Sequence, residues 1–153
     1  MIHIKAAYEA FCRSRFPLPT ERQVADLEDG LGIQLPPDYR EFILRYNGGF
    51  FNEPDIVPPS DNCPKDCLTS LYGIGALHPS AELHPLLAFD FEENDPVVVL
   101  SIGYTLMGNL LWVITHEEGR GAIGLKKAWS DDCFFLAEGI EEFFTLLRQP
   151  EEA

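Results

Sequence analysis

The stretch from residue 35 to residue 49 constrains the fold most, because it contains both a helix start and a helix stop. Pro36 and Pro37 stand at its beginning, and proline suits the first turn of a helix, where its missing N–H would have no partner. Four apolar side chains then follow at the spacing of one helical face: Tyr39, Phe42, Ile43 and Tyr46. Asn47 and Gly48 tolerate the left-handed backbone that ends a helix. We therefore expect a capped helix whose apolar face is buried against a sheet, with Asn47-Gly48 turning the chain into that sheet.

Two further helices are predicted before this stretch. The first covers residues 2–14 and is ended by Pro17 and Pro19. The second begins at a capping box, in which the side chains of Thr20 and Gln23 each accept from the backbone amide of the other. The apolar faces are Ile4, Ala7, Tyr8 and Phe11 in the first helix, and Val24, Leu27 and Leu31 in the second. The first third of the chain is therefore three helices with short connections.

The segment from residue 52 to residue 67 has a different composition. It contains four prolines, at Pro54, Pro58, Pro59 and Pro64. Proline cannot donate to a strand ladder, so we expect a loop here and not a strand. Residues 68–74 are apolar again and fit either a strand or a short helix. Residues 86–89 are also apolar, with little in their pattern that favours a strand.

The second half of the chain predicts a β-meander followed by a helix. Runs rich in β-branched or aromatic residues predict strands over residues 97–102, 110–115, 122–129 and 133–136. The connections are too short for parallel crossovers, so neighbouring strands should be antiparallel. A closing helix that ends at Pro150 is predicted from the helical spacing of Ile140, Phe143, Phe144 and Leu147.

This order of elements places the chain in the α+β class. We expect one domain over residues 1–153, with N-terminal helices, a central, mainly antiparallel twisted β-sheet and a closing C-terminal helix.

The charge of the chain is unusual. There are 25 acidic and 11 basic side chains, which gives a net charge of −14. Such a surface repels phosphate backbones, so direct binding of nucleic acid is not expected. It attracts a basic partner and speeds the encounter with it. The alternative is a generally acidic, soluble protein whose charge serves no particular partner.

The sequence also predicts the compartment. The N-terminus has no long apolar run and no small-residue cleavage site, so a signal peptide is not expected. No apolar segment approaches the length that spans a bilayer. We therefore expect a cytoplasmic protein that has no membrane partner and whose four cysteines are thiols.

The sequence carries no recognisable catalytic or metal-binding motif. Its four histidines and four cysteines could pair for nucleophilic catalysis, as any such set could. Cys63 and Cys67 form the one close cysteine pair, and no second Cys or His pair with zinc spacing accompanies them. The acidic run at residues 90–95 lacks the mid-loop glycine and the distal glutamate of a calcium loop. We predict no enzyme, no metal and no cofactor; an active site assembled from residues far apart in sequence stays an alternative.

Four sequence blocks occur in a characteristic order. They are an acidic amphipathic helix over residues 24–32, the stretch 35–49, Gly108-Asn109 ahead of an apolar strand, and residues 136–144. The signature residues of the second block are Leu35, Pro36, Tyr39, Phe42, Asn47 and Gly48. With these blocks the chain resembles the SUKH superfamily, the bacterial immunity proteins and fungal cell-wall regulators of the Smi/Knr type. Trp129, the last residue of the third predicted strand, resembles the tryptophan that often stands after this strand in that family.

The resemblance implies both a fold and a function. It implies a mainly antiparallel sheet with helices packed against it, and it offers no catalytic residues to carry over. Bacterial members of the superfamily bind and neutralise a cognate polymorphic toxin, often a nuclease or a nucleic-acid deaminase. The charge of −14 fits this role, because a toxin that grips nucleic acid presents a basic face. We therefore predict an immunity protein, monomeric or dimeric, whose partner is a protein toxin with a basic surface.

Two acidic turns are the predicted contact face for the toxin. They contain Glu92, Glu93, Asp95, Glu117 and Glu118. The alternative is that these carboxylates are simply solvated. A different function also stays open, that of a non-enzymatic scaffold or regulatory protein-interaction module of the cell-wall-regulator type. Such regulators usually carry long disordered flanks, which this sequence does not show, so the bacterial type is expected.

Overall fold

The computed structural model describes residues 2–76, 82–83, 86–90, 96–116 and 119–150. The helices are α1 (Ile2–Phe11), α2 (Glu21–Leu31), α3 (Pro37–Arg45) and α4 (Ile140–Thr145). The strands are β1 (Cys12–Ser14), β2 (Gly49–Phe51), β3 (Asp55–Ile56), β4 (Asp66–Leu71), β5 (Leu86–Asp90), β6 (Pro96–Thr105), β7 (Leu110–Ile114), β8 (Ile123–Lys126), β9 (Cys133–Ala137) and β10 (Leu147–Arg148). This arrangement confirms the α+β class, with helices first, then a large antiparallel sheet and a closing helix.

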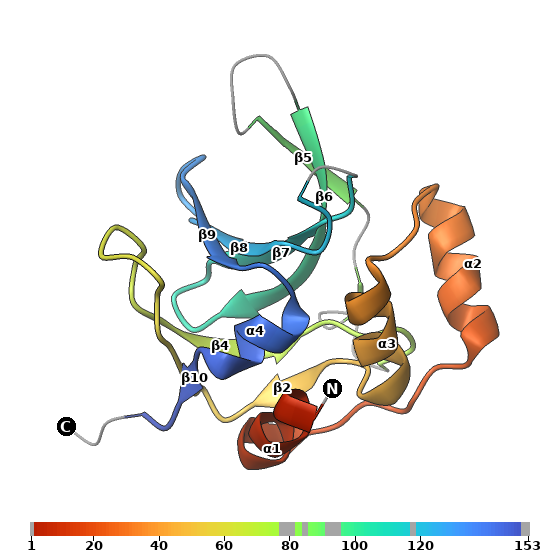
Figure 1. Cartoon of the computed structure of the whole chain (residues 1–153), viewed down its shortest axis with the longest axis horizontal. Helices are drawn as coiled ribbons and strands as arrows, with labels where there is room; N and C mark the ends of the chain where they lie inside the picture. Colours follow the sequence, from red (N-terminus) through yellow and green to blue (C-terminus); the bar gives the residue numbers. More distant parts are fainter. Residues whose placement is uncertain (1, 77–81, 84–85, 91–95, 117–118, 151–153) are drawn as a thin grey trace.

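The main sheet follows the strand order β1-β2-β4-β6-β7-β8-β9, and β5 adds to β6. The short strand β3 lies between β4 and β10. Each of these strand pairings is antiparallel. The predicted meander therefore exists as β6 to β9, because each strand returns beside the one before it. The strand predicted over residues 122–129 is shorter than expected, since β8 ends at Lys126 and Trp129 lies in the turn that follows. Figure 1 shows the sheet behind the helices, with α2 outermost.

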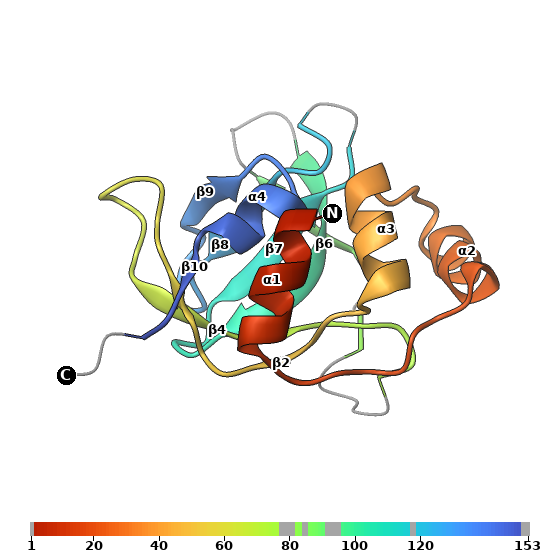
Figure 2. The same ribbon diagram turned by 60° about the horizontal axis from the view of Figure 1, so that its bottom comes forward.

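The core lies between the helices α1, α3 and α4 and one face of the sheet. Figure 2 shows α1 in front of the strands β6 and β7, with α4 and α3 on either side of it. Phe42 of α3 and Phe144 of α4 are fully buried, with ring centroids 5.4 Å apart. Tyr8 of α1 packs edge-on against Phe51 of β2, with ring centroids 5.8 Å apart. These aromatic contacts join three helices and the sheet in one apolar layer, and each buried ring contributes roughly 1.5–3 kcal/mol.

The first helix is shorter than predicted. It ends at Phe11, and Cys12–Ser14 form the edge strand β1, in which Cys12 pairs with Phe51 of β2. The backbone N–H of Asn52 donates to the carbonyl of Phe11 (2.8 Å), which carries this pairing up to the helix end. The sheet edge, and not Pro17, therefore ends the helix, because pairing with β2 satisfies the backbone that a further helical turn would have used.

The predicted capping box at the start of α2 is confirmed. The backbone N–H of Thr20 donates to Oε1 of Gln23 (2.8 Å), and the backbone N–H of Gln23 donates to Oγ1 of Thr20 (3.2 Å). The guanidinium of Arg40 in α3 then bonds to Glu28 (3.0 Å) and Glu21 (2.9 Å) of α2. This pair of ionic contacts holds α2 against α3, although α2 buries little apolar surface of its own.

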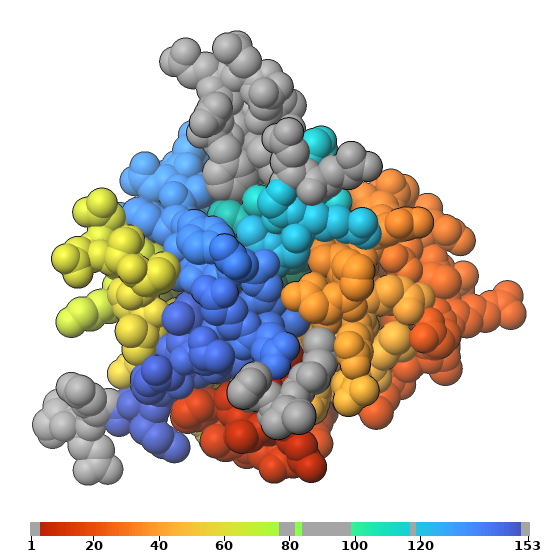
Figure 3. Space-filling view, viewed as in Figure 1, coloured from red at the N-terminus to blue at the C-terminus, as the bar shows by residue number. Residues whose placement is uncertain are grey.

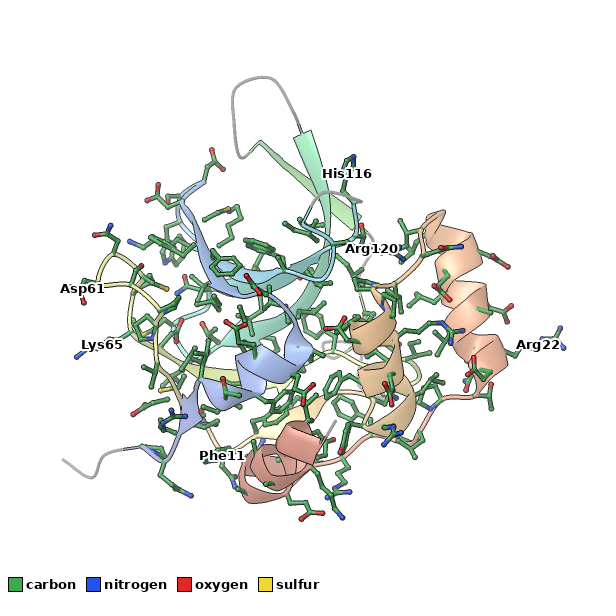
Figure 4. All side chains as sticks on the ribbon, viewed as in Figure 1. Phe11, Arg22, Asp61, Lys65, His116 and Arg120 are labelled. Carbon is green, nitrogen blue, oxygen red and sulfur yellow. The ribbon has the colours of Figure 1, made fainter. Side chains whose placement is uncertain are left out.

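The stretch 35–49 folds as predicted into a helix, α3, followed by a turn into the sheet. Tyr39, Phe42 and Ile43 are buried, as expected, whereas Tyr46 is half-buried and packs on the ring of Tyr8 (4.5 Å between centroids). Arg120, which is distant in sequence, holds the segment that leads into α3, because its Nη2 donates to the carbonyls of Gln34 (2.8 Å) and Leu35 (3.0 Å). Figure 4 labels Arg120 where the β7–β8 connection approaches the start of α3.

Asn47 and Gly48 form the turn that leads from α3 into β2. Both have left-handed backbones, with φ of 57° and 74°. The fully buried Asn47 side chain donates to the carbonyls of Pro17 (2.7 Å) and Ile74 (2.8 Å), and its Oδ1 accepts from the N–H of Ile74 (2.8 Å). A Cβ at Gly48 would lie 2.4 Å from the carbonyl oxygen of Leu71. The turn is therefore a fixed cross-link between three segments of the chain.

Several sequence-based expectations about short elements were wrong. The segment 52–67 is not entirely loop, since it contains β3 and the first two residues of β4. Residues 86–90, for which the pattern gave little support, form the strand β5. The closing helix stops at Thr145, and Leu147 belongs to β10, where it pairs with Ile56 of β3. In each case a strand of only a few residues forms because another strand supplies its hydrogen-bond partners.

Candidate protein-interaction surface

Three chain connections meet at one end of the sheet and carry exposed apolar side chains. These are the β3–β4 connection, the β6–β7 turn and the β8–β9 turn. We call their exposed large apolar residues the apolar tip: Val57 (42 % exposed), Leu106 (54 %), Met107 (65 %) and Trp129 (94 %). Figure 3 shows the β3–β4 segment in yellow and the β8–β9 segment in blue adjoining on one edge of the molecule. Apolar residues gathered on a surface in this way are typical of a contact site for another molecule.

The β6–β7 turn is held by a buried carboxylate. Asp66 at the start of β4 is only 6 % exposed. Its Oδ1 accepts from the backbone N–H groups of Cys67 (2.8 Å) and Met107 (3.1 Å). Its Oδ2 accepts from the hydroxyl of Thr105 and from Nδ2 of Asn109 (2.8 Å). Four donors satisfy the carboxylate, which offsets the cost of burying it and fixes Leu106 and Met107 in an outward position.

Asn109 connects this turn to the next one. While its Nδ2 donates to Asp66, its Oδ1 accepts from the backbone N–H of Ala128 in the β8–β9 turn (3.1 Å). Gly108 before it has φ of +81°, which favours glycine. One amide therefore joins three connections that are distant in sequence. This gives Gly108-Asn109, noted from the sequence as one of the four blocks, a physical role.

The β8–β9 turn is closed by its own polar groups. Nζ of Lys126 donates to the carbonyls of Lys127 (3.2 Å) and Ser130 (2.9 Å). The backbone N–H of Lys127 donates to the carbonyl of Asp132 (3.0 Å). Trp129 stands in the middle of this braced turn, with 94 % of its surface exposed. A large ring held out on a fixed turn loses little conformational freedom on binding, and tryptophan is enriched among the residues that dominate binding energy.

A shallow hollow of about 350 Å³ lies beside Leu106 and Met107. Val57, Pro58 and Lys65 are among the other residues that line it. Figure 4 shows Lys65 and Asp61 pointing away from the body of the molecule at this edge. The hollow can take an apolar side chain of a partner, with charged groups of both signs around it.

Comparison with protein families decides where this fold belongs. The model of the SMI1 / KNR4 family (SUKH-1) matches residues 18–146. The chain belongs to the SMI1/KNR4 (SUKH-1) family. Comparisons with curated proteins and with solved structures found no match. The SUKH-1 match runs from α2 through α4 and includes every residue of the apolar tip. Membership places the protein among the immunity and Smi1/Knr4-type proteins.

The contact residues predicted from the sequence lie outside the part that the structure describes. These are Glu92, Glu93, Asp95, Glu117 and Glu118. The apolar tip, in contrast, was not predicted. A signal was present, because Leu106-Met107 and Trp129 stand within sequences of turn composition, before Gly108-Asn109 and Ser130-Asp131-Asp132. A large apolar side chain in a turn between two strands cannot point into the core as readily as one within a strand.

The thiols of this SUKH-1 protein favour the protonated form. Burial raises the pKa of Cys67 to about 11, and a hydrogen bond from Sγ to Oδ1 of Asp55 (3.2 Å) adds to the effect. Burial also raises the pKa of Cys12, Cys63 and Cys133. The thiolate is the nucleophile, so a raised pKa lowers the nucleophilic reactivity of these four cysteines at neutral pH.

Among the described residues, no three His, Cys, Asp or Glu side chains are grouped so that they could hold a metal ion. None of the described helices is both long enough and apolar enough to span a bilayer.

Proposed function

We propose that this SUKH-1 protein is a cytosolic immunity protein that binds a cognate toxin and neutralises it by covering its working surface, without catalysis. Family membership supports a role of the immunity or Smi1/Knr4 type. The observation that carries the proposal is Trp129, an almost fully exposed tryptophan on a braced turn of a chain with a net charge of −14. Exposed aromatic anchors serve protein partners, and the charge selects a basic one.

Charge and apolar contact have separate tasks in this proposal. A toxin that cleaves or deaminates nucleic acid carries a basic surface to hold phosphates, and an acidic protein meets such a surface at a high association rate. The lifetime of the complex then depends on contacts from which water is excluded. Trp129, Leu106 and Met107 are the best candidates for these contacts. The five predicted acidic residues, Glu92, Glu93, Asp95, Glu117 and Glu118, belong to the first task and the apolar tip to the second.

The test begins with the reading frames that neighbour this protein's gene, where we expect a large secreted protein with a C-terminal toxin domain, and uses that domain as the binding partner. The wild-type protein should protect cells that express this domain and should bind it in isothermal titration. Trp129→Ala should raise Kd by roughly 30-fold, the equivalent of about 2 kcal/mol for a dominant contact residue.

The matched control is Leu18→Ala. Leu18 is also an exposed apolar residue (61 %), but it is not part of the apolar tip. This variant should bind within about twofold of wild type, because it changes a similar exposed side chain outside the tip. If Trp129→Ala bound as tightly as wild type, the apolar tip would not be the contact. Failure of the wild type to bind or protect against any neighbouring toxin domain would favour the scaffold or regulatory role.

A further inference from the structure

The strand β9 is an edge of the sheet. Among the described strands it pairs with β8 alone. The Lys127 N–H donates to the carbonyl of Asp132 (3.0 Å), so these two residues form a hydrogen-bonded pair. Hydrogen-bonded and non-hydrogen-bonded pairs alternate along an antiparallel ladder. Phe134 therefore directs its backbone groups to β8, whereas Cys133 and Phe135 direct theirs away from it.

The usual protections of an edge strand are missing from residues 133–135 of β9. Native edges are commonly blunted by charged residues, proline or bulges. The five residues of β9, Cys133–Ala137, include neither a charge nor a proline. The register shift against β8 comes after Phe135, so the pairing of residues 133–135 stays regular. The Phe135 side chain is 51 % exposed. This edge can accept the backbone of another extended segment.

The charges at both ends of β9 indicate what would pair with it. Asp131 and Asp132 precede the strand and Glu138 follows it, and all three are exposed. A second copy, paired antiparallel so that all five residues match, would place Asp132 opposite Glu138 at both ends. Opposed like charges destabilise a strand pair, and two chains of −14 also repel each other. A segment with basic residues at its ends would instead find a carboxylate at each end.

The nearby lysines do not cancel this pattern, because both are engaged by groups of the β8–β9 hairpin itself. Nζ of Lys126 donates to two carbonyls of the β8–β9 turn. Nζ of Lys127 lies 5.8 Å from the centroid of the Phe134 ring. The edge is also continuous with the apolar tip, since Trp129 stands in the turn that leads into β9.

We propose that β9 receives an extended segment of the basic partner as an added edge strand, apolar in its middle and carrying Lys or Arg at both ends. This inference rests on the proposed function for the identity of the partner. The added strand bonds to the outward backbone groups of Cys133 and Phe135, its apolar side chains cover Phe135, and its basic ends meet Asp131, Asp132 and Glu138. The apolar tip and the edge then form one continuous interface.

The first test uses a peptide, so it does not depend on any toxin. The probe is the acetylated and amidated peptide Lys-Lys-Thr-Val-Thr-Val-Thr-Val-Lys-Lys, titrated into the ¹⁵N-labelled protein. We expect shifts centred on the amides of Cys133 and Phe135, and slower hydrogen exchange at both. The counterpart with Glu in place of Lys should bind at least tenfold more weakly. A copy that is N-methylated at alternate residues cannot complete the ladder and should not bind. Shifts centred elsewhere, or equal binding of all three peptides, would overturn the proposal.

The second test changes the edge itself. Phe135→Pro removes the outward N–H, and proline is accepted on an edge strand where the N–H faces solvent. This variant should bind the Lys peptide and the toxin domain at least tenfold more weakly than wild type. Phe135→Ala keeps that N–H and should have a smaller effect on the peptide. If Phe135→Pro bound both like wild type, the edge would not be used, even if Trp129→Ala still lost toxin binding. If the peptide bound at β9 while the toxin domain failed to bind, β9 would be confirmed as an edge that accepts an added strand, and the proposed function would be contradicted.

The oligomeric state of the protein tests whether a second copy of the chain occupies the β9 edge. The wild-type protein should sediment as a monomer at concentrations where the Lys peptide binds. A dimer that Phe135→Pro dissociates would overturn the proposal in favour of a second copy at this edge.

Discussion

Nδ2 of Asn109 lies 2.8 Å from Oδ2 of the buried Asp66, although 43 positions of sequence separate the two residues. The same Asn109 accepts from Ala128 through its Oδ1. One side chain thus holds the β6–β7 turn against the start of β4 and against the β8–β9 turn. The surface that we propose for binding is built on this contact, so its strength can be tested apart from any partner.

Asn109→Ala should destabilise the fold by about 1–3 kcal/mol, because it leaves the buried carboxylate of Asp66 with one donor fewer. Urea unfolding monitored by circular dichroism measures the change. The control, Asp61→Ala, alters an exposed carboxylate of the β3–β4 connection and should stay within about 0.5 kcal/mol of wild type. A loss below 0.5 kcal/mol for Asn109→Ala would mean that the contact does not hold the turns.

Gly48→Val should unfold the domain before it affects any partner specifically. The new Cβ would lie 2.4 Å from the Leu71 carbonyl oxygen, at a φ of +74° that side chains rarely adopt. Thermal unfolding and partner binding should be measured on the same samples. Gly30→Ala is the control, since nothing lies within 4 Å of its added Cβ, and it should stabilise α2 by about 0.5–1 kcal/mol. A Gly48→Val protein of wild-type stability that no longer binds would make this turn part of the working surface.

Arg40→Ala should cost about 1–2 kcal/mol, because Arg40 is the cation that joins Glu21 and Glu28 of α2 to α3. Arg45→Ala provides the comparison. Arg45 pairs with Glu41 on an exposed helix surface, and such pairs contribute about 0.3–0.5 kcal/mol. Unfolding should be measured at low and high salt, where the difference between the variants should shrink but persist. Equal losses for the two arginines would remove the special role of Arg40.

Cys67 should react slowly with iodoacetamide at pH 8 and much faster as the pH approaches 11, where its pKa lies. Peptide mass spectrometry separates it from the other three cysteines. The pKa is raised above the ordinary value of 9.0, so the protonated thiol is favoured in the folded state. The raised pKa of Cys67 therefore contributes to the free energy of unfolding below pH 9, and this contribution is lost as the pH rises towards 11.

Asp55→Asn is the matched variant for this titration, because it removes the charge of the carboxylate that bonds to the Cys67 thiol. It should lower the pKa of Cys67 and increase its alkylation rate at pH 8 several-fold, while burial keeps the pKa above 9. Rapid alkylation of Cys67 in the wild type at pH 8 would contradict the raised pKa.

Association and dissociation rates should separate the two parts of the proposed interface. Reversing the charge at Glu92 and Glu93 to Lys should slow association with the toxin domain and flatten its dependence on salt, because long-range charge acts on the encounter. Trp129→Ala should mainly speed dissociation. Reversal at Glu9 and Glu142, two exposed residues of α1 and α4, makes the same change in net charge elsewhere. If both pairs of reversals slowed association equally, net charge alone would matter and the predicted acidic turns would have no special place.

The sequence by itself determined the elements whose signals are local. The capping box of Thr20 and Gln23, the apolar face of α3 and the β-branched runs of β6 and β7 were all predictable, because caps and periodicity act within a few residues. The order of the helices and the meander followed from these signals and the short connections between them. The acidic charge, which favours a basic partner, is likewise a property of the sequence.

Only the tertiary structure decided the features that depend on a distant partner. Cys12–Ser14, Asp55–Ile56 and Leu147–Arg148 are strands because β2, β4 and β3 lie beside them, and strands of two or three residues have no stability alone. The apolar tip belongs to the same class. Trp129 and Leu106 face solvent together because Asn109 and Asp66 meet across the fold, and no spacing in the sequence encodes that meeting.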